Sequence, residues 1–212
     1  MKTKILPAFI VLFFAASTAN AQITEGKYLL GGSFGLTSAT NQNSNSVSAN
    51  LQFGKVIKEN TVVGIIASIA VSNNKQSGQS TRVDQYSAGV FYRKYKPLNN
   101  NFFLFGEIDA SYQASNTNYY YFTNVNQTLI TKNHGGYISF TPGVAYSVTK
   151  HLQMELTMQN LASLYYTHIK TIDSSLPPNV APQKASNISA NVNLNSSLLN
   201  SFGLGFKLLL GK

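Results

Sequence analysis

The stretch FFLFGEIDASYQ, from Phe102 to Gln113, decides the fold because its side chains alternate in character. One set of alternate positions carries Phe102, Leu104, Ile108, Ala110 and Tyr112, and the other carries Glu107, Asp109, Ser111 and Gln113. Successive side chains of a β-strand point to opposite faces of its sheet. This stretch therefore predicts a strand with one apolar face and one polar face.

The same alternation recurs along the chain on both sides of this stretch, and helical periodicity is hard to find after residue 21. It is imperfect in one strand, where Val62 and Ile66 occupy polar positions. The pattern predicts an all-β protein with eight strands, at Lys27–Thr37, Ser46–Ile57, Thr61–Ser72, Arg82–Lys96, Asn101–Ala114, Gly136–Val148, Leu152–Tyr166 and Leu198–Leu210.

The connections between these strands alternate in length. Tight turns are predicted at Lys58–Asn60, Pro97–Asn100 and Thr149–His151, and longer polar loops at Ser38–Asn45, Asn73–Ser80, Ser115–Gly135 and Thr167–Ser197. Short periplasmic turns and longer extracellular loops are typical of outer-membrane barrels. We therefore predict an eight-stranded antiparallel up-and-down transmembrane β-barrel. Pro142 cannot donate to a strand ladder, so we expect a bulge at Pro142–Gly143.

The composition agrees with a surface that faces lipid. Only 11% of the residues are charged, against about 25% in soluble proteins, and a lipid-facing surface tolerates charge poorly. A soluble barrel with its apolar faces inward would show the same period. The net charge of +9 comes from scattered basic residues, which favours anionic lipid head groups over nucleic acid as a partner. The chain has no cysteine, so disulfides and thiolate metal sites are excluded.

The N-terminal 21 residues have the three parts of a secretory signal peptide. Two lysines precede an apolar run from Ile5 to Ala16, and Ala19-Asn20-Ala21 fits signal peptidase. The run is shorter than the ~20 residues of a spanning helix. We expect cleavage before Gln22, a barrel domain at 22–212, and a location in the outer membrane of a Gram-negative bacterium, with outer-membrane lipid and the barrel-assembly machinery as partners.

Four short stretches carry a family resemblance. They are Phe140–Tyr146 (FTPGVAY), Phe91–Pro97 (FYRKYKP) followed by Phe102–Glu107 (FFLFGE), and Phe202–Phe206 (FGLGF). They resemble the "outer membrane protein beta-barrel domain" proteins that are common in Bacteroidota, and the resemblance covers essentially all of residues 22–212. It implies a fold similar to OmpA-type eight-stranded barrels and says little about function.

The predicted inward faces carry several charged side chains. These are Arg93, Glu107, Asp109, Glu155 and Lys207. The interior of an eight-stranded barrel is just wide enough to be filled by side chains. Buried charges must pair, so we predict a structural ion-pair network that plugs the lumen. Glu107 and Asp109 could also form an acid pair for catalysis, but no substrate cleft is implied.

Two other features are candidates for function. A lipid hydrolase would need a serine close to His134 or His168, and neither these nor His151 has metal-ligand spacing. The aromatic run Tyr119, Tyr120, Tyr121 and Phe122 suggests either a surface patch for an unknown extracellular ligand or an extension of its strand.

From these observations we predict a structural or surface-interaction protein, not an enzyme, without cofactor or metal. A narrow passage for small molecules is the first alternative, and an enzyme acting on outer-leaflet lipid is the second.

Overall fold

The computed structural model describes residues 23–39, 43–76, 78–122, 126–177, 180–192 and 202–211. The predicted signal peptide lies outside these residues. The described chain is all-β, and no helix in it is long and apolar enough to cross a membrane. Its strands are β1 (Tyr28–Ala39), β2 (Ser44–Lys58), β3 (Thr61–Gln76), β4 (Gln79–Pro97), β5 (Phe102–Phe122), β6 (Asn126–Ser147), β7 (Leu152–Met158), β8 (Ala162–Asp173), β9 (Gln183–Val192) and β10 (Phe202–Leu210).

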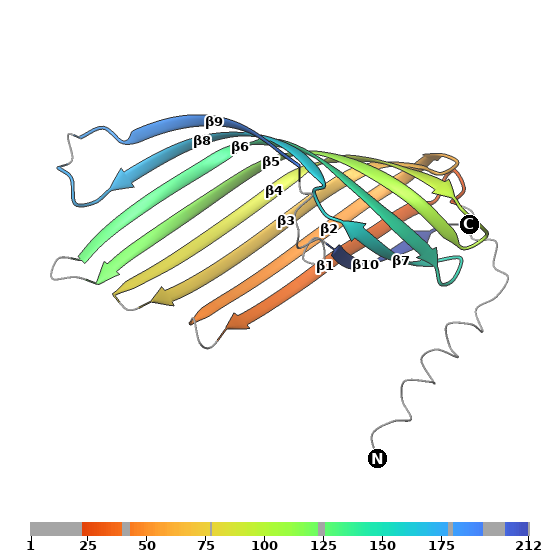
Figure 1. Cartoon of the computed structure of the whole chain (residues 1–212), viewed down its shortest axis with the longest axis horizontal. Coiled ribbons are helices and arrows are strands. Elements are labelled where there is room, and N and C mark those ends of the chain that lie inside the picture. The colour runs from red at the N-terminus through yellow and green to blue at the C-terminus, as the bar shows by residue number, and fades with distance from the viewer. Residues whose placement is uncertain are drawn as a thin grey trace, which may run out of the picture.

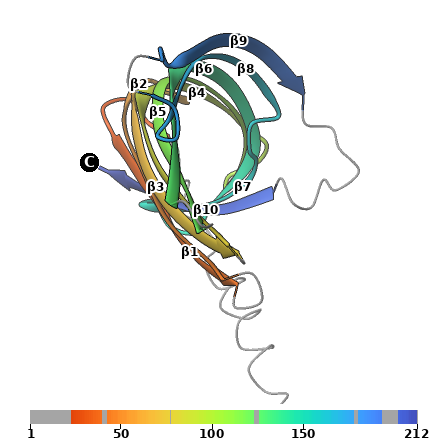
Figure 2. The same ribbon diagram turned by 90° about the vertical axis from the view of Figure 1, so that its left-hand side faces the viewer.

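Eight of these strands close an antiparallel ring, which confirms the predicted barrel. Each strand from β1 to β6 pairs with the next along the chain, β7 pairs with β10, and β10 pairs with β1. Figure 1 shows the strands as long tilted ribbons, and Figure 2 shows the curved wall that they form. The end with the β2–β3, β4–β5 and β6–β7 connections is called the turn end here, and the opposite end the loop end.

The strands β8 and β9 extend this wall toward the loop end. The strand β6 pairs with β7 near the turn end and with β8 near the loop end, so β8 continues the line of β7 after a short interruption. The strand β9 then pairs with β8. The prediction of a polar loop at Thr167–Ser197 was therefore wrong over most of the described part. The weak alternation of β9 (QKASNISANV) explains why the sequence did not reveal it.

Two other predicted long loops also consist largely of strand extensions. The strand β5 continues to Phe122 and β6 begins at Asn126, so most of the predicted loop Ser115–Gly135 belongs to one hairpin. The strands β3 and β4 likewise extend through most of the predicted loop Asn73–Ser80. An extended hairpin pairs the backbone groups of both strands, and Thr and Tyr favour strands. A polar composition was thus mistaken for a loop.

The outer wall is apolar, as the alternation predicted. Large side chains such as Leu51, Ile65, Ile108 and Leu204 are exposed on it. Near the turn end the same face carries two aromatic pairs, Tyr28 stacked on Phe53 and Phe102 tilted against Tyr146. Apolar bands flanked by aromatic side chains are typical of transmembrane barrels.

The bulge expected at Pro142–Gly143 lies instead in the facing strand. Phe140 pairs with Ala162 and Gly143 pairs with Thr157, so the β7–β8 side holds two extra residues. Asn160, within this interruption, has a positive φ of 50°. Pro142 still pairs with Gly106 of β5. The proline therefore faces the one place where its neighbour forms no regular ladder, and no hydrogen bond from it is needed there.

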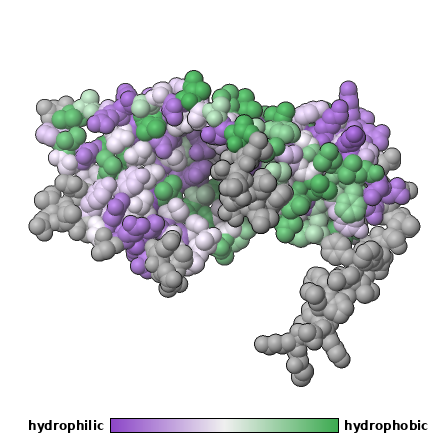
Figure 3. Space-filling view, in the orientation of Figure 1, coloured by the Kyte–Doolittle hydropathy of each residue, from purple (hydrophilic) through white to green (hydrophobic). Residues whose placement is uncertain are grey.

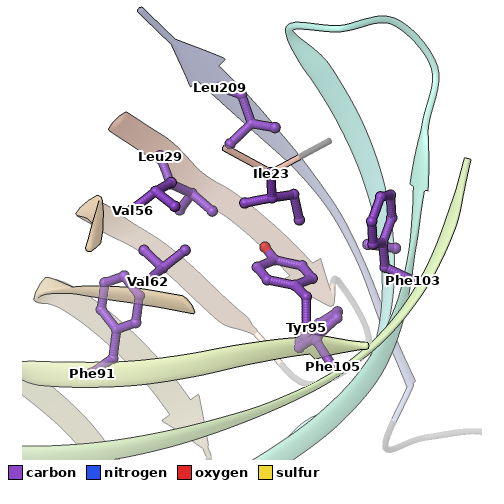
Figure 4. Packing of buried hydrophobic residues seen from close by; sticks show 10 residues of the cluster. Ile23, Leu29, Val56, Val62, Phe91, Tyr95, Phe103, Phe105 and Leu209 are labelled. Carbon is purple, nitrogen blue, oxygen red and sulfur yellow. The ribbon is translucent and has the colours of Figure 1, made fainter. Parts of the chain in front are cut away.

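The hydrophobic core fills the lumen at the turn end. It consists of Ile23, Leu29, Val56, Val62, Phe91, Tyr95, Phe103, Phe105, Ala145 and Leu209, with Ile66 packed against it. Figure 4 shows these side chains converging from several strands. Ile23 precedes β1, and its carbonyl accepts a hydrogen bond from the Asn60 amide. The imperfect alternation at Val62 and Ile66 thus marks inward positions that are apolar because they belong to this core.

Candidate functional site

The centre of the candidate site is Arg93, which extends from β4 into the lumen above the apolar core. Its side chain is only 2% exposed. Arg93 Nε donates to Glu107 Oε2 of β5 at 2.6 Å, and Nη1 donates to Glu155 Oε1 of β7 at 2.5 Å. The pair with Glu107 follows from the register, because these two residues face each other across the β4–β5 ladder. The pair with Glu155 crosses the lumen and could not be read from adjacent strands.

Neutral groups complete the hydrogen bonding of these charges. Arg93 Nη1 also donates to the Tyr95 hydroxyl at 2.9 Å, and the guanidinium lies 4.4 Å from the centre of the Phe105 ring. Gln52 Nε2 donates to Glu107 Oε2 at 2.8 Å, while Lys207 Nζ donates to Gln52 Oε1. A Cβ at Gly31 would collide with the Lys207 side chain, so the glycine leaves room for the lysine to cross the strand.

The five predicted lumenal charges are therefore not all paired in the same way. Arg93 forms ion pairs with both Glu107 and Glu155, and Lys207 is connected to this group through Gln52. Asp109 lies farther toward the loop end, where Asp109 Oδ2 accepts from Ser139 Oγ at 3.2 Å. Asp109 Oδ1 has no hydrogen-bond partner in the part of the chain that the structure describes.

On the loop-end side of these charges the lumen holds a polar cavity of about 270 Å³. Its lining includes the charged residues and the hydroxyls of Ser139 and Thr141. The cavity also touches Gly32, Ser33, Leu204 and Phe206, at the place where the β1–β10 pairing ends. Figure 3 shows hydrophilic side chains inside a hollow on this side of the molecule. The geometry can hold polar groups or water, and the carboxylates of Glu107 and Asp109 both line the cavity.

Comparison with known proteins gives a likeness of fold. The chain is similar to the crystal structure of the outer membrane protein OprG from Pseudomonas aeruginosa, with a TM-score of 0.50 and 12% identity, over 91% of this chain and 99% of that chain. It also matches a major outer membrane protein from Thermus thermophilus (TM-score 0.46, 11% identity, 87% and 99% covered) and the translocator domain of the autotransporter NalP from Neisseria meningitidis (TM-score 0.35, 12% identity, 96% and 94% covered).

No protein family and no curated protein matches the chain by sequence. At 12% identity the likeness to OprG shows the fold alone. That fold is a β-barrel of the outer-membrane type. The resemblance to the Bacteroidota barrel family remains a prediction.

The histidines form no metal cluster among the described residues. His151 lies in the turn before β7, whereas His134 of β6 and His168 of β8 face each other with ring centres 5.0 Å apart. Ser186 of β9 lies beside them, its Oγ 3.0 Å from His168 Nδ1. A nucleophilic serine needs a histidine that is itself oriented by a third group. No carboxylate is hydrogen-bonded to either ring among the described contacts. Asp173 instead accepts two hydrogen bonds from Ser175, which lower the pKa of its carboxyl.

The aromatic run Tyr119–Phe122 lies in the loop-end part of β5. Residues 119–121 pair with β4 on one side and with β6 on the other, and Tyr120 is exposed. The structure thus places these aromatics in a strand extension.

Sequence reasoning missed the apolar half of the lumen and the part played by Gln52. The apolar part of the lumen could have been found from the consecutive apolar residues at Phe102–Phe105 and Leu208–Leu210, because both faces of the strand are apolar there. No signal marked Gln52, because its contact with Glu107 joins strands far apart in sequence.

Proposed function

We propose that this chain is an exported outer-membrane barrel of a Gram-negative bacterium whose lumen is closed, and that it acts through its structure and surface. In this proposal the barrel conducts no steady flow of ions. The protein acts through its contacts with lipid and with extracellular partners at the loop end.

The observation that carries this proposal is the double obstruction near the turn end. Arg93 ties β4 to β5 and β7 through two buried ion pairs, and the ten-residue apolar core lies next to it. An ion passing through the lumen would have to break these pairs and then cross an apolar layer. Either step is costly, since a buried charge without a partner is strongly unfavourable.

Planar bilayer recording tests the closed lumen. We expect no steady conductance from the folded protein. A variant that removes the whole ion-pair group, Arg93→Ala with Glu107→Ala and Glu155→Ala, should show more open events because the upper obstruction is gone. Arg82→Ala with Asp84→Ala is the matched control, since that ion pair lies on the same strand but outside the lumen. A large, steady conductance from the unaltered protein would disprove the proposal.

A passage for small molecules is the second candidate, and the cavity favours it. The lining joins lumenal residues to Leu204 and Phe206, which belong to the outer face of β10. The β1–β10 ladder ends at Gly32 and Phe206, so Ser33 and Gly205 are the next positions on each side. In a variant with Ser33→Cys and Gly205→Cys, a disulfide between the two cysteines would link β1 to β10 at this point. If molecules pass at this point, uptake of a small apolar dye into vesicles should fall on oxidation and recover on reduction. A closed structural barrel predicts no change.

The enzyme alternative depends on Ser186 and His168. An outer-leaflet hydrolase would release fatty acid from phospholipid vesicles, and Ser186→Ala would abolish the release. Labelling of Ser186 by a fluorophosphonate would show an activated serine. We expect neither, because no carboxylate contact with His168 is seen among the described residues.

A further inference from the structure

Three lysines form a row across the loop end of the outer wall. Lys132 of β6 pairs in register with Lys170 of β8, and Lys170 pairs with Lys184 of β9. Residues directly opposite on neighbouring strands have Cβ atoms about 5 Å apart. Lys132 and Lys184 are exposed and Lys170 is half-buried. The row is therefore a concentrated positive charge that belongs to three separate strands.

These lysines share the outer face with the apolar wall. Lys132 has the same strand parity as Ile138, and Lys170 has the same parity as Leu164. Ile138 and Leu164 are both about half exposed on that wall. Side chains two, four or six positions apart in a strand lie on one face. The lysines accordingly point outward, away from the lumenal carboxylates.

Nothing described on this face neutralises the row. None of the three lysines takes part in an ion pair among the described residues, in which Arg82 and Asp84 form an ion pair on the outer face. Asp84 is in line with the row, since it pairs with Asn116 and Asn116 pairs with Lys132. Asp84 is already bound to Arg82 at 2.9 Å. Like charges directly opposite each other in a sheet are destabilising, so an external anion would stabilise this arrangement.

The residue rows on the turn-end side of the lysines indicate the membrane depth at which that anion would lie. The next row toward the turn end holds His134, His168 and Ser186, and the following one holds Gly136, Tyr166 and Ile188. The apolar wall begins there and continues with Ile138 and Leu164. Tyrosine is enriched at the membrane–water interface, and lysines near the end of a span extend toward the head groups. The lysine row thus lies at the head-group depth of the leaflet at the loop end.

We propose that Lys132, Lys170 and Lys184 bind the phosphate of an anionic lipid in the outer leaflet. The imidazoles of His134 and His168 and the hydroxyl of Ser186 contribute further polar groups just below, beside the lipid's linkage to its chains. This inference rests on the outer-membrane location given under Proposed function. It adds a defined lipid site to a barrel whose surface would otherwise contact lipid without preference.

The first experiment measures lipid retention by the full-length folded protein in neutral detergent. The probe is a phosphorylated glycolipid of the lipid A type, compared with the same lipid after removal of its phosphates, and native mass spectrometry counts the bound lipids. The test variant is Lys132→Gln with Lys170→Gln and Lys184→Gln. The matched control is Lys58→Gln with Lys94→Gln and Lys96→Gln, which removes the same charge from exposed lysines near the turn end.

We expect the unaltered protein and the control to retain the phosphorylated lipid, and the test variant to bind it roughly one hundredfold more weakly. Equal losses in both variants would overturn the proposal, because only net charge would then matter. Equal binding of the dephosphorylated lipid would also overturn it. If inorganic phosphate displaced the lipid at comparable concentration, the site would bind free phosphate, and the lipid assignment would be wrong.

A second measurement separates this inference from the proposed location. In phosphate-free neutral detergent, Lys170→Gln should raise the urea midpoint of the barrel, because it relieves repulsion within the row. After addition of the phosphorylated lipid, the same variant should have the lower midpoint. A midpoint that moves in the same direction in both conditions contradicts the site. Failure of every variant and of the unaltered protein to fold in detergent or bilayers would instead contradict the membrane barrel.

Discussion

The two ends of this barrel differ in how their strands are held together. At the turn end every strand of the ring has two neighbours, and the lumen is filled by the apolar core and the Arg93 ion pairs. At the loop end, β9 pairs only with β8 among the described strands, and nearly all of its residues are exposed. The comparison teaches that closure and packing coincide: the lumen is packed where the ring is complete.

The largest effect should follow from removing Arg93. Arg93→Ala leaves Glu107 and Glu155 buried without a cation, and breaking a buried pair typically costs about 3–5 kcal/mol. The urea midpoint in lipid vesicles, read from the heat-modifiable gel band, should fall accordingly. Arg82→Ala is the control, because its ion pair is exposed on the outer face. A midpoint that is the same in both variants would show that the turn end does not depend on its lumenal charges.

A smaller loss should follow from a cavity in the apolar core. Leu29 is fully buried at the turn end, so Leu29→Ala should lower the free energy of unfolding by about 3 kcal/mol. Ile169 of β8 points into the lumen at the loop end but is only half-buried, and Ile169→Ala should cost about 1 kcal/mol or less. The same urea titration compares them. Equal losses would erase the proposed difference between the two ends.

Backbone exchange should sharpen the comparison without any substitution. Amide hydrogens of β9 should exchange orders of magnitude faster than those of β5 between Glu107 and Gln113, because β5 has a paired neighbour on each side. Exchange with deuterium followed by mass spectrometry of peptides would measure this. Comparable protection in both strands would indicate that the loop end is held as firmly as the turn end.

The smallest effect concerns the turn between β8 and β9. Hydrogen bonds from Ser175 lower the pKa of the Asp173 carboxyl, so the charged carboxylate stabilises the folded turn. This stabilisation is present at neutral pH and is lost as the pH falls through the lowered pKa. The NMR shift of the Ser175 amide should titrate with a midpoint below that of an unstructured aspartate. A midpoint at or above the unstructured value would contradict the hydrogen bonds, and Asp173→Asn should remove the titration.

The sequence predicted the faces of the strands better than their ends or their partners. Alternation put Ile108 and Glu107 on opposite faces, because parity is a local property, and the low charge and the loop lengths predicted that the apolar face points to lipid. It did not show where β5 and β6 end, since Asn, Ser and Thr occur both in loops and in strand extensions. The alternation also did not reveal the register between the strands. Lys132, Lys170 and Lys184 fall in segments that the sequence predicted as loops, and only the pairing of three strands brings them into one row.

For the lumen, sequence placed all five charges inward but gave no basis for choosing pairs. The structure gives Arg93 two carboxylates and leaves Asp109 with a serine hydroxyl. Which charges meet depends on the tilt of the strands around the ring. That tilt is a property of the closed barrel, and it could not be read from any single strand.

The ladder between β1 and β10 bears on how the barrel assembles. It runs only from Tyr28 and Leu210 to Gly32 and Phe206, and it joins the two ends of a chain whose other neighbours are mostly hairpins. Contacts between residues far apart in sequence form late, because a long loop must lose its freedom before they give any stabilisation. The hairpins can therefore form early as an open, curved sheet, and this short seam then sets the rate at which the barrel closes.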